Sequence, residues 1–546
     1  MIPDLSNLIV LYCLVPLFAG LLSVALVNHQ WPSRILGVIS FATLFLGAVS
    51  TLCAIVPSQD ILVSQMGGWA APYGITLVFD SFSGMLIAAA AAVSLGAYIH
   101  SFSTLQPKVE RRYFHPLIQM LIFGVNLSFL TGDLFNLFVA FEIMLMASYA
   151  LLCLGASDQQ LRHAYKYVLL NILASTVFLM GAGMVYGMLG TLNIADMARI
   201  VAEAQASGES LPVGFTAIGV LFLFVFGLKG AFFPLWFWLP DTYWTVPIAI
   251  GGLFGGLLTK VGVYTIARLF PLVFAQAPPI GVEASDMRVL IMSLIAASAA
   301  FTMFLAVLGA VSQHHIRRIL SIHVISQVGY MVFGIAVMTG QALAGCAFYM
   351  IQHMVVKCSL FLCCGLMEKH SGTDDLDKLG SLLKRDKWLG VLFFVAAMSL
   401  VGLPPLSGFF GKMVIIQSGW SAGLWWLAII GLLTGALTLL SMLKIWSYGF
   451  WNPGPSPEAE PAAVVRSSNH FAYIGTVMLV TMALFLGFGA PVAYEAAFVA
   501  GEQLYNPTAY VEAVLGDGRL GDIAWSDTMD QPTVTPTENL ALRTAP

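Results

Sequence analysis

Apolar residues along this chain fall into long runs separated by short polar stretches. A helix needs about 20 mainly apolar residues to cross the hydrocarbon core of a bilayer. Fourteen runs of this kind begin near residues 8, 35, 80, 115, 134, 166, 213, 244, 286, 320, 342, 387, 421 and 471. The pattern predicts an all-α polytopic membrane protein with about 14 transmembrane helices.

Three segments need a separate interpretation. The first run, residues 8–27, has no basic segment and no small-residue cleavage site, so we expect a retained helix rather than a signal peptide. Residues 61–79 hold three glycines and one proline between short β-branched stretches, which predicts a small extramembrane β-hairpin. From residue 501 onward the chain has seven acidic and two basic residues, which predicts a mostly irregular external tail.

Composition narrows the function classes. The 546 residues are 59% hydrophobic and 10% charged, with a mean hydropathy of +0.86. A soluble protein has roughly 25% charged residues, so a water-soluble enzyme is excluded. A net charge of −4 offers no basic excess for nucleic acid. The seven cysteines lie in apolar stretches without a CxxC motif, so neither a disulfide framework nor a zinc site is indicated.

Basic residues predict the orientation, because Lys and Arg are enriched in cytoplasmic loops. With fourteen spans, the odd-numbered loops carry 14 basic residues and the even-numbered loops carry three: Arg199, Arg268 and Arg288. We therefore expect the odd loops in the cytoplasm and both termini on the outer side of the cell membrane.

Six charged residues fall inside the predicted spans. A charge at the centre of a spanning helix costs about 2.5–3.5 kcal/mol on insertion scales, so each one is a candidate functional residue. Glu142 has no basic residue within a helical turn, so its partner must come from another helix. The five lysines are Lys229, Lys260, Lys357, Lys412 and Lys444.

Glycines and prolines interrupt the predicted helices beside two of these lysines. Lys229 precedes Gly230, Pro234 and Pro240, and Lys412 follows the segment 402–411, which holds Gly and Pro residues. Broken helices at membrane depth face protein or water-filled cavities and often mark binding sites. Either lysine could instead only satisfy the carbonyls that a break leaves free.

The other candidates lie in unbroken runs. Lys260 ends a glycine-rich helix that can pack closely. His353 and Lys357 are four residues apart and share one helical face, either as a proton-conducting pair or as a structural clamp. His323 shares a face with Gln327 and could be a satisfied core histidine, whereas we expect Lys444 to extend to the interface.

Spans four to eight and nine to thirteen form two units of five helices, each with a broken, lysine-bearing helix in fourth place. An odd number of helices reverses the starting side, so the second unit is an inverted repeat, as in transporters. The predicted divisions are residues 1–114 (helices 1–3 with the hairpin), 115–270 (first repeat), 286–448 (inverted repeat), 449–500 (C-terminal helix) and 501–546 (polar external tail).

At these residues the sequence resembles a known family. The segments 133–149, 228–240, 353–357 and 402–412 resemble the antiporter-like subunits shared by Mrp-type multisubunit Na⁺/H⁺ antiporters and respiratory NADH:quinone oxidoreductase. The resemblance covers roughly residues 80–450, and residues 133–149 are most similar to the D-type subunits of Mrp antiporters.

The resemblance implies roles for the buried charges. Glu142 and Lys229 would form an ion pair beside a proton path, Lys260, His323 and Lys357 would relay protons along a central hydrated axis, and Lys412 would be the terminal site. His323 stands where relatives often carry Ser or another polar residue. Because a nearby carboxylate stabilises a protonated lysine, movement of the Glu142–Lys229 contact would control proton transfer to the next site.

Three functions remain open. The first is a secondary antiporter subunit, assembled with other subunits in the bilayer, that expels Na⁺ in exchange for protons. The second is a proton-pumping membrane subunit of an NADH:quinone oxidoreductase-type redox complex. The third is a structural scaffold whose charges only hold helices together. The sequence shows no haem, iron–sulfur, nucleotide or flavin motif, so no cofactor is expected, and it does not identify a site for a metal ion.

Overall fold

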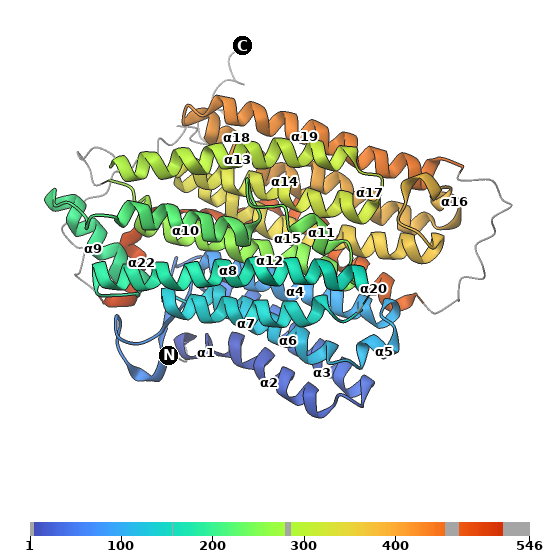
Figure 1. Cartoon of the computed structure of the whole chain (residues 1–546), viewed down its shortest axis with the longest axis horizontal. Coiled ribbons are helices and arrows are strands. Elements are labelled where there is room, and N and C mark those ends of the chain that lie inside the picture. Colours follow the sequence, from blue (N-terminus) through green and yellow to red (C-terminus); the bar gives the residue numbers. More distant parts are fainter. Residues whose placement is uncertain (1–4, 156, 279–284, 454–468, 517–546) are drawn as a thin grey trace, which may run out of the picture.

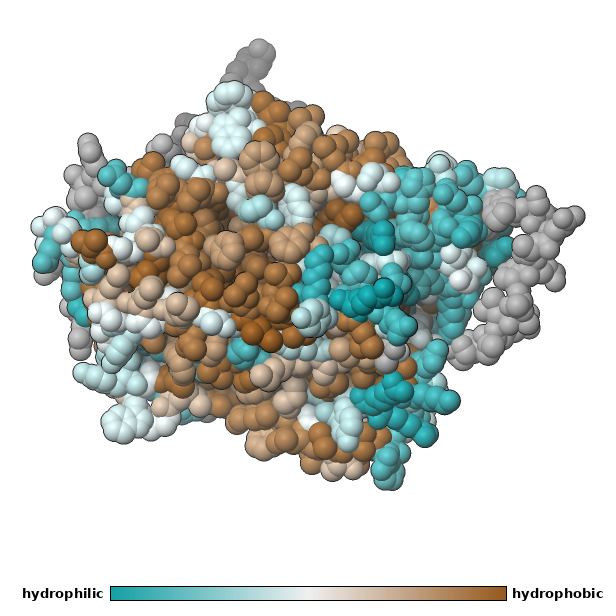
Figure 2. Space-filling model, in the orientation of Figure 1, coloured by the Kyte–Doolittle hydropathy of each residue, from teal (hydrophilic) through white to brown (hydrophobic). Residues whose placement is uncertain are grey.

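Long helices run side by side along the long axis of the molecule (Figure 1). The computed structural model describes residues 5–155, 157–278, 285–453 and 469–516. Hydrophobic side chains cover the middle of the surface, and hydrophilic side chains gather at the right-hand end, near α5 and α16 of Figure 1 (Figure 2). This is the surface expected of a protein whose helices cross a bilayer.

The first half of the described chain contains the hairpin and the first broken helix. In chain order these are α1 (Leu5–Leu8), α2 (Leu11–Ala25), α3 (Gln30–Ile55), α4 (Ser81–Thr104), α5 (Pro107–Glu110), α6 (Phe114–Leu130), α7 (Leu134–Leu152), α8 (Asp158–Leu189), α9 (Ile194–Ser207), α10 (Phe215–Gly230), α11 (Leu239–Tyr243) and α12 (Ile248–Leu269). A five-residue segment with wider, π-type turns, Phe270–Phe274, extends α12.

The second half begins after the residues 279–284, which lie outside the described part. Its helices are α13 (Asp286–Ser312), α14 (Ile316–Val337), α15 (Gly340–Ser371), α16 (Leu382–Arg385), α17 (Lys387–Val401), α18 (Ser407–Ser421), α19 (Trp425–Trp446), α20 (His470–Phe488), α21 (Ala490–Tyr505) and α22 (Pro507–Leu515). A second π-type segment, Ser447–Trp451, extends α19.

The predicted membrane class is confirmed. Within the described residues, eleven helices are long and apolar enough to cross a membrane, and three shorter apolar helices (α6, α10 and α17) accompany them. The predicted hairpin is also present: strands β1 (Leu62–Gln65) and β2 (Thr76–Phe79) pair antiparallel, with Leu62 opposite Phe79.

Both predicted helix breaks are present. The helix α10 ends at Gly230, Ala231 takes a left-handed conformation, and α11 begins only at Leu239. The helix α17 ends at Val401, where Gly402 has φ 92°, a value that suits a residue without a Cβ, and α18 begins at Ser407. The breaks leave the carbonyls at the ends of α10 and α17 without helical partners.

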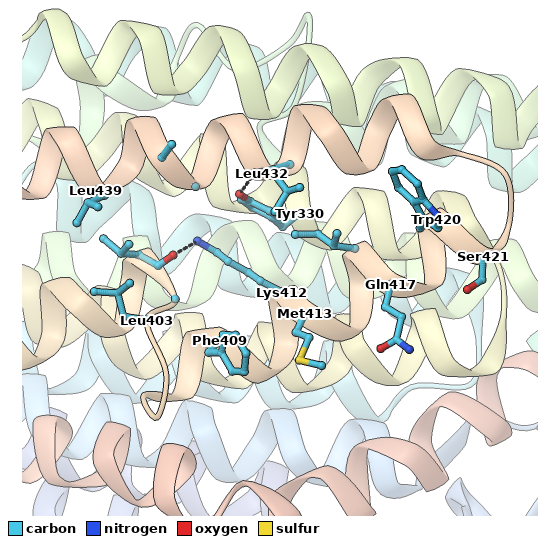
Figure 3. Close-up of a pocket in the computed structure, with 16 residues that line it drawn as sticks. Tyr330, Leu403, Phe409, Lys412, Met413, Gln417, Trp420, Ser421, Leu432 and Leu439 are labelled. Atoms are coloured by element: carbon cyan, nitrogen blue, oxygen red, sulfur yellow. Dashed lines mark hydrogen bonds between the residues drawn. The ribbon is translucent and has the colours of Figure 1, made fainter. Parts of the chain in front are cut away.

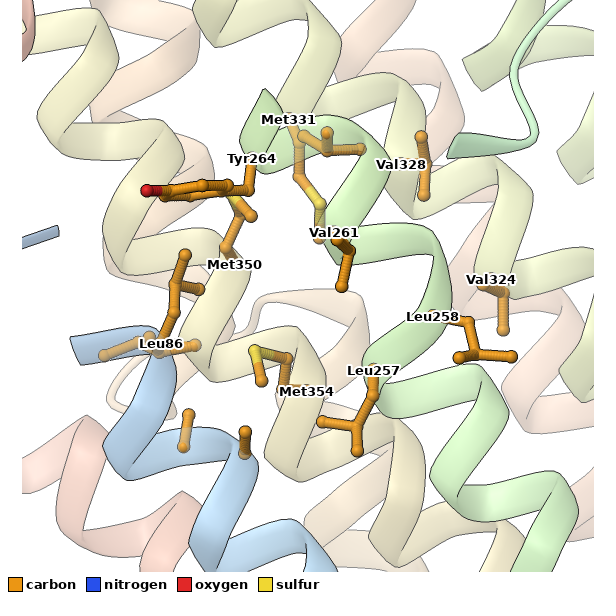
Figure 4. Close-up of a cluster of buried hydrophobic side chains, with 14 of the residues drawn as sticks. Leu86, Leu257, Leu258, Val261, Tyr264, Val324, Val328, Met331, Met350 and Met354 are labelled. Carbon is orange, nitrogen blue, oxygen red and sulfur yellow. The ribbon is translucent and has the colours of Figure 1, made fainter. Parts of the chain in front are cut away.

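The innermost helices are α4, α12, α14 and α15 (Figure 4). Every residue of α12 is buried, and so is every residue of α15 from Ala342 to Met367. The helices α12 and α15 pack closely at a glycine: a Cβ added at Gly256 of α12 would lie 3.2 Å from the Met354 carbonyl oxygen of α15. Lys260, His323, His353 and Lys357 on these helices are therefore enclosed by protein.

Two predictions were wrong: the loop position of Arg268 and the irregular structure of residues 501–515. Arg268, expected in a loop, lies buried inside α12, because both guanidinium nitrogens of its fork donate to Asp80, the N-cap of α4. Residues 501–515, expected to be irregular, continue α21 and form α22, in which Tyr510, Val511 and Val514 make a buried face against α9 and the hairpin. The rest of the predicted tail, residues 517–546, lies outside the described residues.

Candidate functional site

Glu142 and Lys229 lie on neighbouring helices without touching. Glu142 is midway along α7, which begins after the capping residue Asp133, and its buried Oε1 has no hydrogen-bond partner among the described residues. Lys229, in the last turn of α10, donates from Nζ to Ser175 Oγ of α8 at 3.1 Å. No salt bridge within 4.0 Å joins these two described residues, although the Glu142 charge reaches Lys229 electrostatically. The implied ion pair is open in this structure.

A close helix crossing brings Lys229 to the helix that carries Lys260. A Cβ added at Gly262 of α12 would lie 2.6 Å from the Gly230 nitrogen and 2.9 Å from the Lys229 carbonyl carbon. Only glycine fits there, so α10 and α12 touch at the backbone immediately beside the first break. Lys260 lies two residues before this crossing.

Lys260 is fully buried and is held by its own helix. Its Nζ donates to the Gly255 carbonyl oxygen at 2.6 Å and to Thr259 Oγ1 at 3.1 Å. The charge of Lys260 also acts on Lys357 and His353 of α15. The glycine-rich packing of α12 against α15 thus places two predicted sites next to each other.

His353 and Lys357 carry unsatisfied polar atoms in the centre of the molecule. Both side chains are fully buried, and among the described residues neither His353 ring nitrogen nor Lys357 Nζ has a hydrogen-bond partner. A buried polar group without a partner costs about 1–3 kcal/mol, and more if it is charged. Stability alone does not account for this pair, because apolar side chains would fit the same surroundings.

His323 connects the axis to α19. Its Nε2 lies 2.8 Å from Ser441 Oγ, and its Nδ1 lies 3.3 Å from Ser326 Oγ. His323 lies on α14, which packs against both α15, the helix of Lys357, and α18, the helix of Lys412. The ring has hydroxyl neighbours on both nitrogens, an arrangement that suits both a satisfied core histidine and a proton relay.

Lys412 lies at the second break (Figure 3). Its Nζ donates to the carbonyl oxygens of Leu400, at 2.8 Å, and Val401, at 3.0 Å, which are the freed carbonyls at the end of α17. The ammonium also lies 4.6 Å from the centre of the Tyr330 ring. A cavity of about 820 Å³ opens beside it, and Lys412 is the only charged residue among the described residues that line this cavity.

Lys444 stands apart from these residues. Its Nζ donates to the carbonyl oxygens of Val311, at 3.1 Å, and Gln313, at 2.8 Å, at the C-terminal end of α13. A cation there complements the helix dipole and the free carbonyls. Lys444 therefore has a structural explanation that Lys357 lacks.

The structure adds polar partners that the sequence did not single out. Ser175 accepts a hydrogen bond from Lys229, Ser441 contacts His323, and Tyr349 donates to Gln327 on the face shared with His323. A hydroxyl in an apolar helix gives a weak signal, because Ser and Tyr are common in spanning helices. The packed helices α12, α14, α15 and α18 carry five buried basic side chains, which we call the central axis: Lys260, His353, Lys357, His323 and Lys412.

The fold and this axis define a class of membrane proteins with broken helices and buried basic side chains. Residues 131–438 match the family described as NADH:quinone oxidoreductase/Mrp antiporter, transmembrane. The chain belongs to this family, as its motifs predicted.

Relatives place the chain more closely. It is 42% identical, over 94% of its length and 100% of the relative, to the D-type subunit of the Na⁺/H⁺ antiporter of Alkalihalophilus pseudofirmus, and 38% identical, over the same shares, to the D-type subunit of the Bacillus subtilis antiporter. Among solved structures, the Mrp complex from Dietzia sp. DQ12-45-1b matches with TM-score 0.84 and 29% identity, over 94% of this chain and 100% of that one. An archaeal membrane-bound sulfane sulfur reductase shares the fold, with TM-score 0.81 and 23% identity, over 93% of this chain and 100% of that one.

Proposed function

We propose that this chain is the proton-translocating subunit of a multisubunit Na⁺/H⁺ antiporter in the cell membrane. One observation carries the proposal: buried titratable side chains lie on packed helices from the Gly230–Gly262 crossing, beside Lys229, to Lys412. The 42% identity to a D-type antiporter subunit, over 94% of the chain, supports antiport and assembly with other subunits. The alternative, a proton-pumping subunit of a redox complex, is supported by the family description, which also names NADH:quinone oxidoreductase, and by the fold shared with an archaeal respiratory complex.

In the proposed cycle, the contact between Glu142 and Lys229 opens and closes. Approach of the carboxylate stabilises a proton on Lys229, and separation releases it across the Gly230–Gly262 crossing to Lys260. The proton then passes through Lys357, His353 and His323 to Lys412. The hydrogen bond from Lys229 to Ser175, in place of a contact with Glu142, supports an open state of the pair in this cycle.

The proposed architecture has fourteen spans, made of the eleven long helices and the three shorter apolar ones. Helices α6, α7, α8, α10–α11 and α12 form the first repeat, and α13, α14, α15, α17–α18 and α19 form the inverted second repeat. Matching lengths support this division: the third helix has 32 residues in each unit, and the fifth has 22 residues followed by five in π-type turns. The basic asymmetry then places both termini outside.

Replacement of Glu142 tests the function. Glu142→Gln keeps the size of the side chain and removes only its charge, so we expect Na⁺-dependent dissipation of the pH gradient in everted vesicles to disappear while the complex assembles on native gels. Glu203→Gln, on the exposed side of α9, is the matched control and should exchange normally. Normal exchange by the Glu142 variant would contradict the proposed role of the pair.

A further inference from the structure

A buried polar stripe follows α8 from Lys229 toward one end of the molecule. Tyr167, Asn171 and Ser175 are spaced four residues apart and are buried, although α8 as a whole is largely exposed. Ser175 accepts from Lys229, and Asn171 Nδ2 donates to the Tyr167 carbonyl oxygen at 2.9 Å. Residues at this spacing line one face of a helix, so the stripe leads from the first lysine to the Tyr167 phenol.

A second line on α7 runs parallel to the stripe and starts at Glu142. Tyr149 follows Glu142 by seven residues, two helical turns on the same face, at a rise of about 10 Å. Its ring meets the Tyr167 ring edge-on at 5.5 Å, and Ser148 Oγ lies 3.0 Å from the Tyr167 hydroxyl. The Tyr149 phenol interacts electrostatically with both Tyr167 and Glu142. Both lines therefore meet at Tyr167.

The short helix α11 extends this meeting point to the surface. The buried Trp238 packs between Tyr167 and Tyr243, with ring centroids 5.1 and 5.9 Å away. Lys166, just before Tyr167, and Asp241, two residues before Tyr243, form a salt bridge of 2.9 Å, and their side chains are 39% and 40% exposed. The residues beside Tyr167 and Tyr243 thus lie at the surface of the protein.

Two of the three phenols have no partner. The hydroxyls of Tyr149 and Tyr243 are buried without a hydrogen-bond partner among the described residues. An unsatisfied buried hydroxyl destabilises a protein, so phenylalanine would serve better if these rings only filled space. The neighbouring rings Phe141, Phe178 and Phe226 lack hydroxyls and pack in the same region.

We propose that Tyr243, Tyr167 and Tyr149 form a proton relay between the surface beside Lys166–Asp241 and Glu142. It rests on the proposed function and adds the path by which the Glu142–Lys229 pair exchanges protons with the cytoplasm. Each phenol oxygen accepts one proton from a chain of bridging water molecules and passes its own proton on, so that every phenol ends neutral. The Glu142 carboxylate gains one proton and the water at the surface loses one; the reverse order returns it.

Replacement by phenylalanine isolates the hydroxyls. Tyr149→Phe and Tyr243→Phe remove no protein hydrogen bond, so both variants should assemble and melt at or above the wild-type temperature. We expect Na⁺-dependent proton flux in everted vesicles to fall at least about tenfold. The solvent deuterium isotope effect on the remaining flux should rise, because proton supply then limits the rate. Tyr12→Phe, which removes a hydroxyl bonded to Thr51 on α3, is the matched control and should keep wild-type flux.

The outcomes separate this proposal from the proposed function. If Glu142→Gln is inactive and both phenylalanine variants keep wild-type flux and isotope effect, the relay is refuted and the antiport function stands. If Glu142→Gln is active, the proposed function itself fails. Flux that falls only because a variant no longer assembles at wild-type levels would make the tyrosines structural and would also refute the relay.

Discussion

At the residue scale, the lysines of the site differ in the groups that accept hydrogen bonds from them. Lys260 and Lys412 donate to backbone carbonyls, Lys229 donates to a serine, and Lys357 has no hydrogen-bond partner in the described structure. A lysine that caps carbonyls has a structural explanation, whereas one without a partner does not. The two explanations compete most directly at Lys412, which lies at a break and at the end of the central axis.

Substitution by arginine decides the role of Lys412. Arginine keeps the positive charge but does not release its proton in proteins. If Lys412 must deprotonate in each cycle, Lys412→Arg should transport almost as poorly as Lys412→Ala, measured as Na⁺-dependent collapse of the pH gradient in everted vesicles. If the lysine only caps Leu400 and Val401, arginine should restore most of the activity. Near-wild-type activity of the arginine variant would remove Lys412 from the proton path.

A second ionic site lies outside the spans and predicts acid sensitivity. Glu110 of α5 accepts two bonds from Arg34, at 2.7 and 2.8 Å, and lies 3.1 Å from His115 Nε2. Burial alone would raise the pKa of Glu110, but the neighbouring His115 ring, the hydrogen bonds from Arg34 and the Arg34 charge lower the pKa below its usual 4.5. A lowered carboxyl pKa stabilises the fold above that usual value, and the stabilisation is lost as the pH falls through the lowered value.

Glu110→Gln tests this contribution. The substitution leaves the Arg34 charge without its partner, so we expect a loss of about 3–5 kcal/mol at pH 7, seen as a lower melting temperature of the purified complex. The difference from wild type should shrink as the pH falls below 4.5 toward the lowered pKa of Glu110, because the unfolded wild-type chain then binds a proton that the folded protein does not. Glu203→Gln, in an exposed pair, should change the stability by less than about 1 kcal/mol. A constant difference between pH 7 and pH 4 would contradict the ionic explanation.

At the element scale, the breaks and the glycine crossings set the positions of the charges. The helix α10 ends at Gly230, just after Lys229. Gly262 lets the backbone of α12 contact the backbone of Lys229 and Gly230. At the second break, a Cβ added at Gly408 would lie 2.0 Å from the Ser399 carbonyl oxygen, so α18 can return against α17 only with glycine there. Backbone contact, more than side-chain packing, determines where the two broken helices meet their neighbours.

Gly262→Ala tests the first crossing. The added methyl would meet Gly230 N at 2.6 Å and must push α10 from α12. We expect a stability loss of about 1–3 kcal/mol and a severalfold loss of Na⁺-dependent proton flux, because Lys229 moves away from Lys260. Gly183→Ala on α8, where a Cβ meets nothing within 4 Å, should leave flux unchanged. Normal flux in an assembled Gly262 variant would show that transfer between the two lysines does not depend on this contact.

At the scale of the whole molecule, the open question is its orientation in the membrane. With Arg268 buried inside α12, the distribution of basic residues between odd and even loops is 14 to two, which predicts that the loop between α15 and α17 is cytoplasmic and the loop between α9 and α10 is external. The hydrophilic surface near α5 and α16 marks the same end of the molecule as these basic loops (Figure 2). The relay proposed above opens at that end, so its cytoplasmic assignment depends on the orientation.

Cysteine labelling tests the orientation. In a background in which the exposed Cys53 and Cys153 are replaced by alanine, an impermeant thiol reagent on intact cells should label Ser210→Cys and miss Ser381→Cys. Permeabilised cells should give labelling at both positions, which controls for access. The opposite pattern on intact cells refutes the orientation, and labelling of both positions on intact cells refutes the predicted number of spans between them.

The sequence by itself determined the membrane class, the two breaks, the hairpin and the candidate charges. These features depend on local composition. An apolar run must be helical in lipid, Pro removes a helical hydrogen bond, and Gly destabilises a helix through its conformational freedom. Lys229 and Lys412 could be singled out because each stands beside such a break.

Only the tertiary structure decided which charges meet. The pairing of Arg268 with Asp80 joins residues 188 apart in sequence, and the contact of Lys229 with Ser175 depends on how α8 packs against α10. The sequence also missed the helix at 507–515, because its buried face forms only against α9 and the hairpin. Contacts between distant segments depend on helix packing and on close approach at glycine, and neither can be read from the local pattern of apolar and polar residues.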